Sequence, residues 1–132
     1  MIFNLAVSPD GRALAFTVPK QATSILVIPT AGGEPRQVFQ ARMGELPVAN
    51  YSGLAWTPDG RQLLFVRQRV PILQDNRELW AIAAEGGEPR PLGLAMTDLR
   101  ALRIHPDGNR IAVAAGRDVF EVWALEIGRA HV

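Results

Sequence analysis

The stretch LAWTPDGR at residues 54–61 decides the fold, because the chain carries two further versions of it. LAVSPDGR occupies residues 5–12 and LRIHPDGN occupies residues 102–109, so the copies lie about 50 residues apart. Each copy joins a short apolar run to a Pro-Asp-Gly tripeptide. Proline presets an early turn angle and glycine supplies a positive φ, which together favour a tight hairpin with a bulge. The three copies therefore predict three equivalent hairpins.

Two further motifs recur between these hairpins in a constant order. AGGEPR at residues 31–36 returns as EGGEPR at residues 85–90, and Gly-Gly favours a two-residue hairpin loop. An apolar strand motif precedes it, as LVI at residues 26–28 and WAI at residues 80–82, and returns as WAL at residues 123–125. Each repeat therefore predicts four short antiparallel strands, and the third repeat stops after its third strand.

Sheets of four antiparallel strands that recur every 40–50 residues are typical of β-propeller blades. The chain has 12 glycines and 10 prolines, and no segment keeps a helical period for three turns. We predict an all-β fold, a partial β-propeller with blades at residues 3–39, 54–94 and 99–125, the last incomplete. Because a ring needs at least four blades, we expect the remaining blades to lie outside this chain. The open faces of the end blades should then drive self-association.

The repeat resembles that of the TolB-like, WD-like β-propeller family. That family's pattern is apolar-x-aromatic-Ser-Pro-Asp-Gly, then an apolar strand, Leu-Trp, and Gly-Gly with a basic residue. The resemblance runs from Phe3 to Leu125, with Trp56, Trp80 and Trp123 at the family's aromatic positions. The third repeat is similar to the final repeat of propellers that close large bacterial proteins. Many such proteins carry a protein kinase or a DNA-binding regulator domain, and the resemblance implies that context here.

The last residues, EIGRAHV at 126–132, end the repeat pattern abruptly. They match the translation of a common sequencing-adapter string. We therefore predict a non-native tail on a metagenomic fragment, which packs against nothing specific.

Composition excludes several functions. The chain has 14 Lys+Arg against 13 Asp+Glu, so its net charge of +1 argues against a nucleic-acid binder. Its longest apolar runs reach about six residues, far short of the roughly 20 that a membrane helix needs. No cysteine is present, there are only two histidines, and no Gly-rich phosphate loop occurs. We predict no metal, no cofactor and no membrane span, and the compartment stays open between periplasm and cytoplasm.

No catalytic set emerges from the residues. Asp10, Asp59 and Asp107 lie inside Pro-Asp-Gly turns, where an aspartate bonds its own backbone. His105 takes the place of a hydroxyl residue before the third turn, so a turn role is expected rather than that of a base or metal ligand. No serine lies in a Gly-x-Ser-x-Gly elbow. The sequence therefore predicts no enzyme activity.

The best candidates for an interaction surface lie in loops that do not repeat, mainly residues 40–52 and 68–77, because recognition residues concentrate on variable loops of rigid scaffolds. Arg103 is a separate candidate, since the strand nearest the propeller axis carries alanine there in the other repeats. It either lines a central channel or pairs with a carboxylate such as Asp98. The loop candidates are Asn50, Tyr51, Arg69, Gln74, Asp75, Asn76 and Arg77.

The function we expect is non-catalytic. The chain would serve protein interaction or ligand sensing as the C-terminal part of a larger bacterial protein, with an unidentified protein or small ligand as partner. One alternative is the gating propeller of a prolyl-oligopeptidase-like serine peptidase, and another is a periplasmic TolB-like scaffold. The identity of the upstream domain would decide among them.

Overall fold

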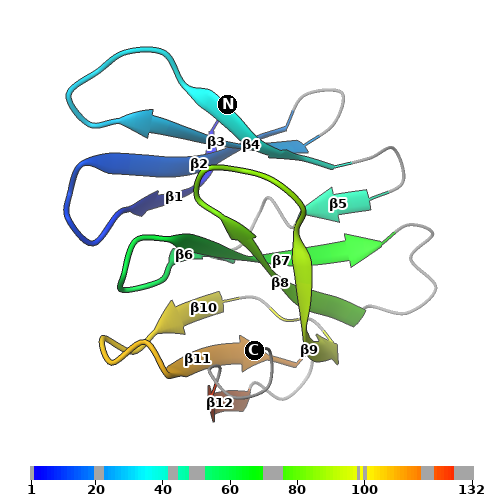
Figure 1. Ribbon diagram of the computed structural model, residues 1–132. Coiled ribbons are helices and arrows are strands. Elements are labelled where there is room, and N and C mark those ends of the chain that lie inside the picture. Colours follow the sequence, from blue (N-terminus) through cyan, green and yellow to red (C-terminus); the bar gives the residue numbers. More distant parts are fainter. Residues whose placement is uncertain are drawn as a thin grey trace.

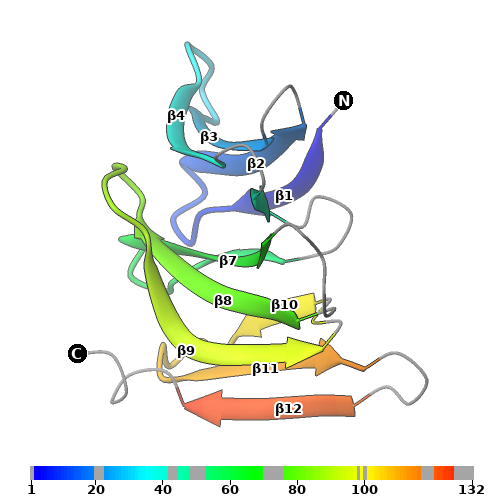
Figure 2. The same ribbon diagram turned by 90° about the vertical axis from the view of Figure 1, so that its right-hand side faces the viewer.

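The computed structural model has strands throughout and, within the part of the chain it describes, contains no helix. Three antiparallel sheets follow one another along the chain and are stacked in that order (Figure 1), as a view from the side also shows (Figure 2). The predicted all-β partial propeller is thereby confirmed. The structure describes residues 2–19, 23–41, 45–47, 53–69, 76–97, 99, 101–116 and 121–126.

The first sheet has four strands in sequential order and corresponds to one complete blade. Its third hairpin uses Gly32 and Gly33, both at positive φ (100° and 123°), as Gly-Gly was expected to do. Along the strands, every second residue points to the same face. The strands are β1 (Phe3–Val7), β2 (Ala13–Pro19), β3 (Thr23–Pro29) and β4 (Arg36–Gln40).

The second sheet contains a strand that the sequence did not predict, so the described strands number twelve rather than about eleven. The extra strand, β5, lies inside the stretch 40–52 that was expected to be a loop. Both β5 and β6 pair with β7, β6 along Leu63–Phe65 and β5 along Arg67–Arg69. β7 is longer than β6, and β5 pairs with the half of β7 that β6 leaves open. The strands are β5 (Glu45–Pro47), β6 (Leu54–Trp56), β7 (Gln62–Arg69), β8 (Asn76–Ala83) and β9 (Arg90–Thr97).

The loop expected at residues 68–77 is also shorter than predicted, and the second blade extends further than predicted. β8 begins at Asn76, and β9 continues to Thr97, where these two residues pair. Polar residues at the strand ends suggested loops, but the antiparallel pairing of β8 with β9 continues through them. The corrections affect the expected loop at residues 68–77 and the expected end of the second blade at residue 94.

The third sheet has three strands among the described residues, as expected of an incomplete blade. Its last strand reaches Glu126, which pairs with Arg110. The tail predicted for residues 126–132 therefore begins one residue later at the earliest, and residues 127–132 lie outside the described part. The strands are β10 (Ala101–Ile104), β11 (Arg110–Ala115) and β12 (Glu121–Glu126).

The core consists of two apolar layers, each between adjacent sheets. The first layer joins residues of the first sheet, including Ile25 and Val27, to Leu63 and Phe65 of the second. The second layer joins the opposite face of the second sheet to the third sheet. The second sheet is thus buried on both faces, which explains why its strands are almost continuously apolar.

Candidate functional site

The first Pro-Asp-Gly turn is held by its own side chains. The Ser8 hydroxyl donates to Asp10 Oδ1 at 2.7 Å, and the backbone N–H of Arg12 donates to the same oxygen at 2.9 Å. The Ser8 oxygen in turn accepts the N–H of Ala13 at 3.0 Å. The Ser8 hydroxyl and then the Arg12 N–H lower the pKa of Asp10, because both bonds favour the carboxylate. The turn role expected for this aspartate is confirmed.

The second turn repeats this arrangement. The Thr57 hydroxyl donates to Asp59 Oδ1 at 2.6 Å, and the backbone N–H of Arg61 donates to it at 2.9 Å. The N–H of Gln62 donates to the Thr57 oxygen at 3.1 Å. The pKa of Asp59 is lowered first by the Thr57 hydroxyl and then by the Arg61 N–H. Sequence repetition therefore reproduces bond geometry as well as backbone shape.

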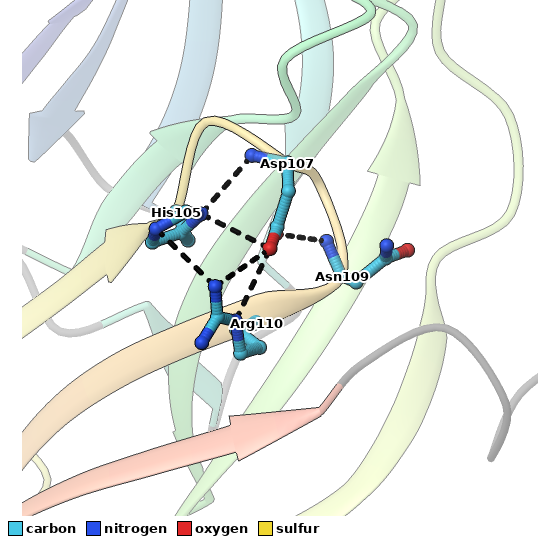
Figure 3. Close-up of polar contacts among 4 residues, drawn as sticks. All are labelled: His105, Asp107, Asn109 and Arg110. Carbon is cyan, nitrogen blue, oxygen red and sulfur yellow. Dashed lines mark hydrogen bonds and ion pairs between the residues drawn. The ribbon is translucent and has the colours of Figure 1, made fainter.

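In the third turn, the imidazole of His105 stands where the other turns have a hydroxyl group, and the side chain of Arg110 joins the hydrogen bonds of the turn (Figure 3). The N–H of Asp107 donates to His105 Nδ1 at 3.1 Å, and the N–H of Asn109 donates to Asp107 Oδ1 at 2.9 Å. Arg110 donates to Asp107 Oδ2 from Nε and Nη2, at 3.1 and 2.9 Å. The bond from the Asn109 N–H, followed by those from Arg110, lowers the pKa of Asp107.

This cluster of His105, Asp107 and Arg110 is solvated and makes its contacts within one turn. His105 Nε2 lies 3.4 Å from Arg110 Nη2, so both ring nitrogens face groups of the same turn. The backbone bonds of the first two turns are kept, since the His105 N–H donates to the Arg110 carbonyl at 2.8 Å. His105 therefore bonds within its own turn, as the sequence predicted. In the described stretches, no three His, Asp or Glu side chains gather where they could hold a metal ion.

A cavity of about 350 Å³ lies along the innermost strands of the three sheets. These strands, β1, β6 and β10, follow one another at the same edge of the stack (Figure 1). Arg103 is the charged residue of the lining, and it stands where the other two repeats have Ala6 and Ala55. The lining residues are Asn4, Leu5, Ala6, Val7, Pro9, Leu54, Ala55, Trp56, Arg103 and Ile104.

The Arg103 side chain is exposed at this cavity, and its Nη1 donates to the carbonyl oxygen of Leu102 at 2.9 Å. A place in the lining of this cavity is what the prediction of a channel-lining Arg103 requires. The alternative partner, Asp98, lies outside the described residues. An exposed guanidinium can bind a carboxylate or phosphate through two parallel hydrogen bonds.

Four of the seven loop candidates lie outside the described residues: Asn50, Tyr51, Gln74 and Asp75. The remaining loop candidates belong to strands instead. Arg69 is the last residue of β7, and Asn76 and Arg77 open β8.

Arg77 was expected on a solvated loop, and the structure corrects this. The side chain is only 7% exposed, and its Nη1 donates to the carbonyl oxygen of Leu99 at 3.1 Å. Because β8 begins one residue earlier, Arg77 lies within the sheet and reaches the segment that leads into the third sheet. The residue thus joins the second sheet to this segment and is buried.

A second buried arginine was missed altogether. Arg67 in β7 is 7% exposed, and its guanidinium carbon lies 4.4 Å from the centre of the Trp80 ring and 5.2 Å from that of Phe39. Strand alternation supplied the signal, because Arg67 follows Leu63 and Phe65 on the face that packs against the first sheet. This contact joins the first two sheets by a cation–π interaction.

Solved structures with similar folds include TolB from Acinetobacter baumannii, with 16% identity, a TM-score of 0.78, and coverage of 98% of this chain and 31% of that one. The putative TolB from Agrobacterium tumefaciens has 19% identity and a TM-score of 0.72, covering 98% and 44%. A prolyl endopeptidase structure has 18% identity and a TM-score of 0.70, covering 98% and 21%. The chain thus spans less than half of each of these proteins, and at these identities the likeness shows the fold alone.

No curated relative matches the sequence. Within the described part, no helix has the length and apolar character needed to cross a membrane. One family model covers residues 2–126, from just before β1 to the end of β12, and so takes in all three repeats. The chain therefore belongs to the family described as the lipoprotein LpqB β-propeller domain.

Proposed function

We propose that this chain is a non-catalytic propeller segment that binds a ligand or protein through the axial end of its blades, as part of a larger bacterial protein. The observation that carries the proposal is the cavity along β1, β6 and β10, with the exposed guanidinium of Arg103 in its lining. Pockets that combine apolar side chains with a few well-placed polar or charged groups are typical of binding sites. A partner that presents a carboxylate would suit this lining.

The chemistry of the described side chains supports binding over catalysis. The pKa of Asp10 and of Asp59 is lowered first by the hydroxyl of the residue before the turn and then by a backbone N–H, and the pKa of Asp107 is lowered first by the Asn109 N–H, so all three stay ionised. A carboxylate in that state is a poor general acid or base near neutral pH. The role of these residues is to hold the hairpins that present the innermost strands.

The test is an array of short acidic and neutral peptides probed with the purified 132-residue chain. We expect acidic peptides to bind, the variant Arg103→Ala to lose that binding, and Arg36→Ala to keep it. Arg36 is an exposed arginine on β4 and takes no part in the axial cavity, so it is a matched control. Absence of binding to any acidic peptide, or equal binding by Arg103→Ala, would overturn the proposal.

A second candidate is a scaffold of the bacterial cell envelope. The family takes its description from a lipoprotein, and two TolB structures share the fold, which supports this alternative. A gating propeller of a serine peptidase is supported more weakly, by the prolyl endopeptidase fold. Sequencing the DNA that flanks the coding region separates them. A lipoprotein signal would favour the scaffold, a hydrolase domain the peptidase, and a kinase or regulator domain the signalling protein.

A further inference from the structure

The third turn differs from the other two at the residue that precedes its proline. Ser8 donates its hydroxyl to Asp10 and at the same time accepts the N–H of Ala13. The hydroxyl of Thr57 does the same in the second turn. A hydroxyl group can form both bonds at once, because its oxygen carries a proton and free lone pairs. A ring nitrogen of histidine either carries a proton or accepts one, so His105 cannot reproduce both bonds.

The Nδ1 atom of His105 lies beside a donor and an acceptor of the same residue. The N–H of Asp107 donates to Nδ1 at 3.1 Å, and Oδ2 of the Asp107 carboxylate also lies 3.1 Å from Nδ1. A neutral ring accepts the N–H at Nδ1. A protonated ring carries a hydrogen on both nitrogens, so Nδ1 loses the bond to the N–H and donates to Oδ2 instead. The two bonds exclude each other, and the charge of the ring selects between them.

Arg110 competes with the imidazole for the same carboxylate oxygen. Its Nε and Nη2 donate to Asp107 Oδ2 at 3.1 and 2.9 Å, so three nitrogens surround this one oxygen (Figure 3). Arg110 Nη2 also lies 3.4 Å from His105 Nε2. A protonated ring places two like charges at this contact and brings a second cation to Oδ2. Protonation therefore weakens the bonds that Arg110 makes to Asp107.

The imidazole is in contact with solvent and has charged neighbours of both signs. Its side chain is 49% exposed, so a proton reaches it without any opening of the fold. Asp107 and Arg110 contact the ring directly. Among the described residues, the charged side chains on the elements around it are Asp107 and Arg110 of its own turn, Arg103 of β10, Glu126 of β12, which pairs with Arg110 in register, and Asp59 and Arg61 of the neighbouring turn.

We propose that the third turn is a pH-sensitive switch, in which protonation of His105 moves Nδ1 from the Asp107 N–H to the Asp107 carboxylate and loosens Arg110. Histidine is the side chain that changes its charge between about pH 5 and about pH 8. The first two turns use the hydroxyl groups of Ser8 and Thr57, which do not titrate in this range. One of three equivalent turns thus contains a residue that responds to pH, and the other two do not.

The switch lies beside the residue that is proposed to bind the ligand. Arg103 borders both the axial cavity and a shallow hollow of about 280 Å³ that His105 also lines. Residues two positions apart on an extended chain lie about 7 Å from each other. A unit charge at that distance in water changes the affinity for an anion by about two- to threefold. Acid should therefore strengthen the binding of carboxylate ligands at Arg103, a consequence that rests on the proposed function.

The test of the switch is NMR spectroscopy of the purified 132-residue chain at about pH 8 and about pH 5. We expect the temperature coefficient of the Asp107 amide proton to become more negative at the lower pH, because its bond to Nδ1 is lost. The Asn109 amide is a matched control in the same turn, since it donates to Asp107 Oδ1 at 2.9 Å and should stay bonded. An unchanged coefficient for Asp107, or the same change for Asn109, overturns the switch.

Two variants show whether the histidine causes the change. His105→Ser and His105→Thr introduce the residues that the first two turns use, so both should fold, which circular dichroism checks. In both variants the Asp107 amide should behave alike at the two pH values. A pH dependence that persists in either folded variant at the size seen in the wild-type chain overturns the assignment to His105.

Binding of acidic peptides measures the regulation separately. The wild-type chain should bind them about two- to threefold more tightly at the lower pH than at the higher one. The ratio of the two affinities should be smaller for His105→Ser, which also corrects for titration of the peptide itself. Equal ratios for the two proteins overturn the regulation of Arg103. If no acidic peptide binds at either pH, the proposed function and this regulation fall together, whereas the amide measurement still decides whether the turn switches.

Discussion

The indole Nε1 of Trp56 donates a hydrogen bond to the carbonyl oxygen of Ala6 at 3.0 Å, and so joins the innermost strands of two adjacent sheets. The two residues lie 50 positions apart in the sequence. The bond fixes β6 against β1 at the wall of the axial cavity. Tryptophan is thus used here for its N–H as well as for its packing.

We predict that Trp56→Phe destabilises the chain by about 1 kcal/mol, because the ring is largely kept and only the hydrogen bond is lost. Trp56→Ala should cost clearly more, because it also removes the ring from the first core layer. Urea unfolding followed by circular dichroism measures both. Equal losses for the two variants would show that the bond to Ala6 contributes little.

A glycine is needed at position 53 because Val66 approaches its backbone closely, and not because its φ is positive. The Cβ of an alanine there would lie 2.9 Å from Val66 Cγ2, and the Gly53 carbonyl accepts the Val66 N–H at 3.0 Å. We expect Gly53→Ala to cost about 1–3 kcal/mol through this clash. The double variant with Val66→Ala should cost less than the sum of the single variants, because the 2.9 Å contact with Cγ2 is removed and only the 3.1 Å contact with the Cβ of residue 66 remains. Strict additivity of the two unfolding free energies would contradict this explanation.

Arg67 should be more important for stability than any exposed arginine. Its guanidinium lies over Trp80 and near Phe39 between the first two sheets, where desolvated cation–π contacts contribute on the order of 2 kcal/mol. Arg67→Ala should therefore destabilise strongly, by more than about 2 kcal/mol. Arg36→Ala, at an exposed site, should stay within about 0.5 kcal/mol. The prediction fails if the two variants unfold at the same urea concentration.

Acid should weaken the hairpins. The pKa of Asp59 is lowered in the folded chain from an ordinary value of 3.8, mainly by the Thr57 hydroxyl and the Arg61 N–H. A lowered folded pKa contributes stability that is present above the ordinary value and is lost as pH falls toward the folded one. Unfolding midpoints measured from about pH 5 to about pH 2 should therefore fall. The decline should be shallower for Asp59→Asn, and an unchanged slope would contradict the role of this carboxylate.

Repetition explains how much could be predicted from the sequence. The Pro-Asp-Gly and Gly-Gly turns lie at fixed intervals, so they predict the hairpins and the blades directly. β5 has no such turn and depends on the unpaired half of β7, which local patterns do not reveal. Arg77 was expected on a loop and Arg67 was overlooked because arginine is usually exposed, whereas an aromatic ring accommodates Arg67 and a carbonyl oxygen Arg77 in the interior. Such contacts depend on the neighbouring sheet and not on the sequence around each arginine.

The last prediction concerns catalysis, for which His105 is the natural suspect. Its Nδ1 accepts the Asp107 N–H at 3.1 Å, and its Nε2 lies 3.4 Å from Arg110 Nη2. A general base needs a ring nitrogen within reach of the proton that it removes, and here both nitrogens face the turn. We therefore expect the purified chain to release no fluorophore from peptide amidomethylcoumarin substrates. His105→Ala and the matched Asn109→Ala variant should be equally inactive, and hydrolysis that only the first substitution abolishes would establish an enzyme.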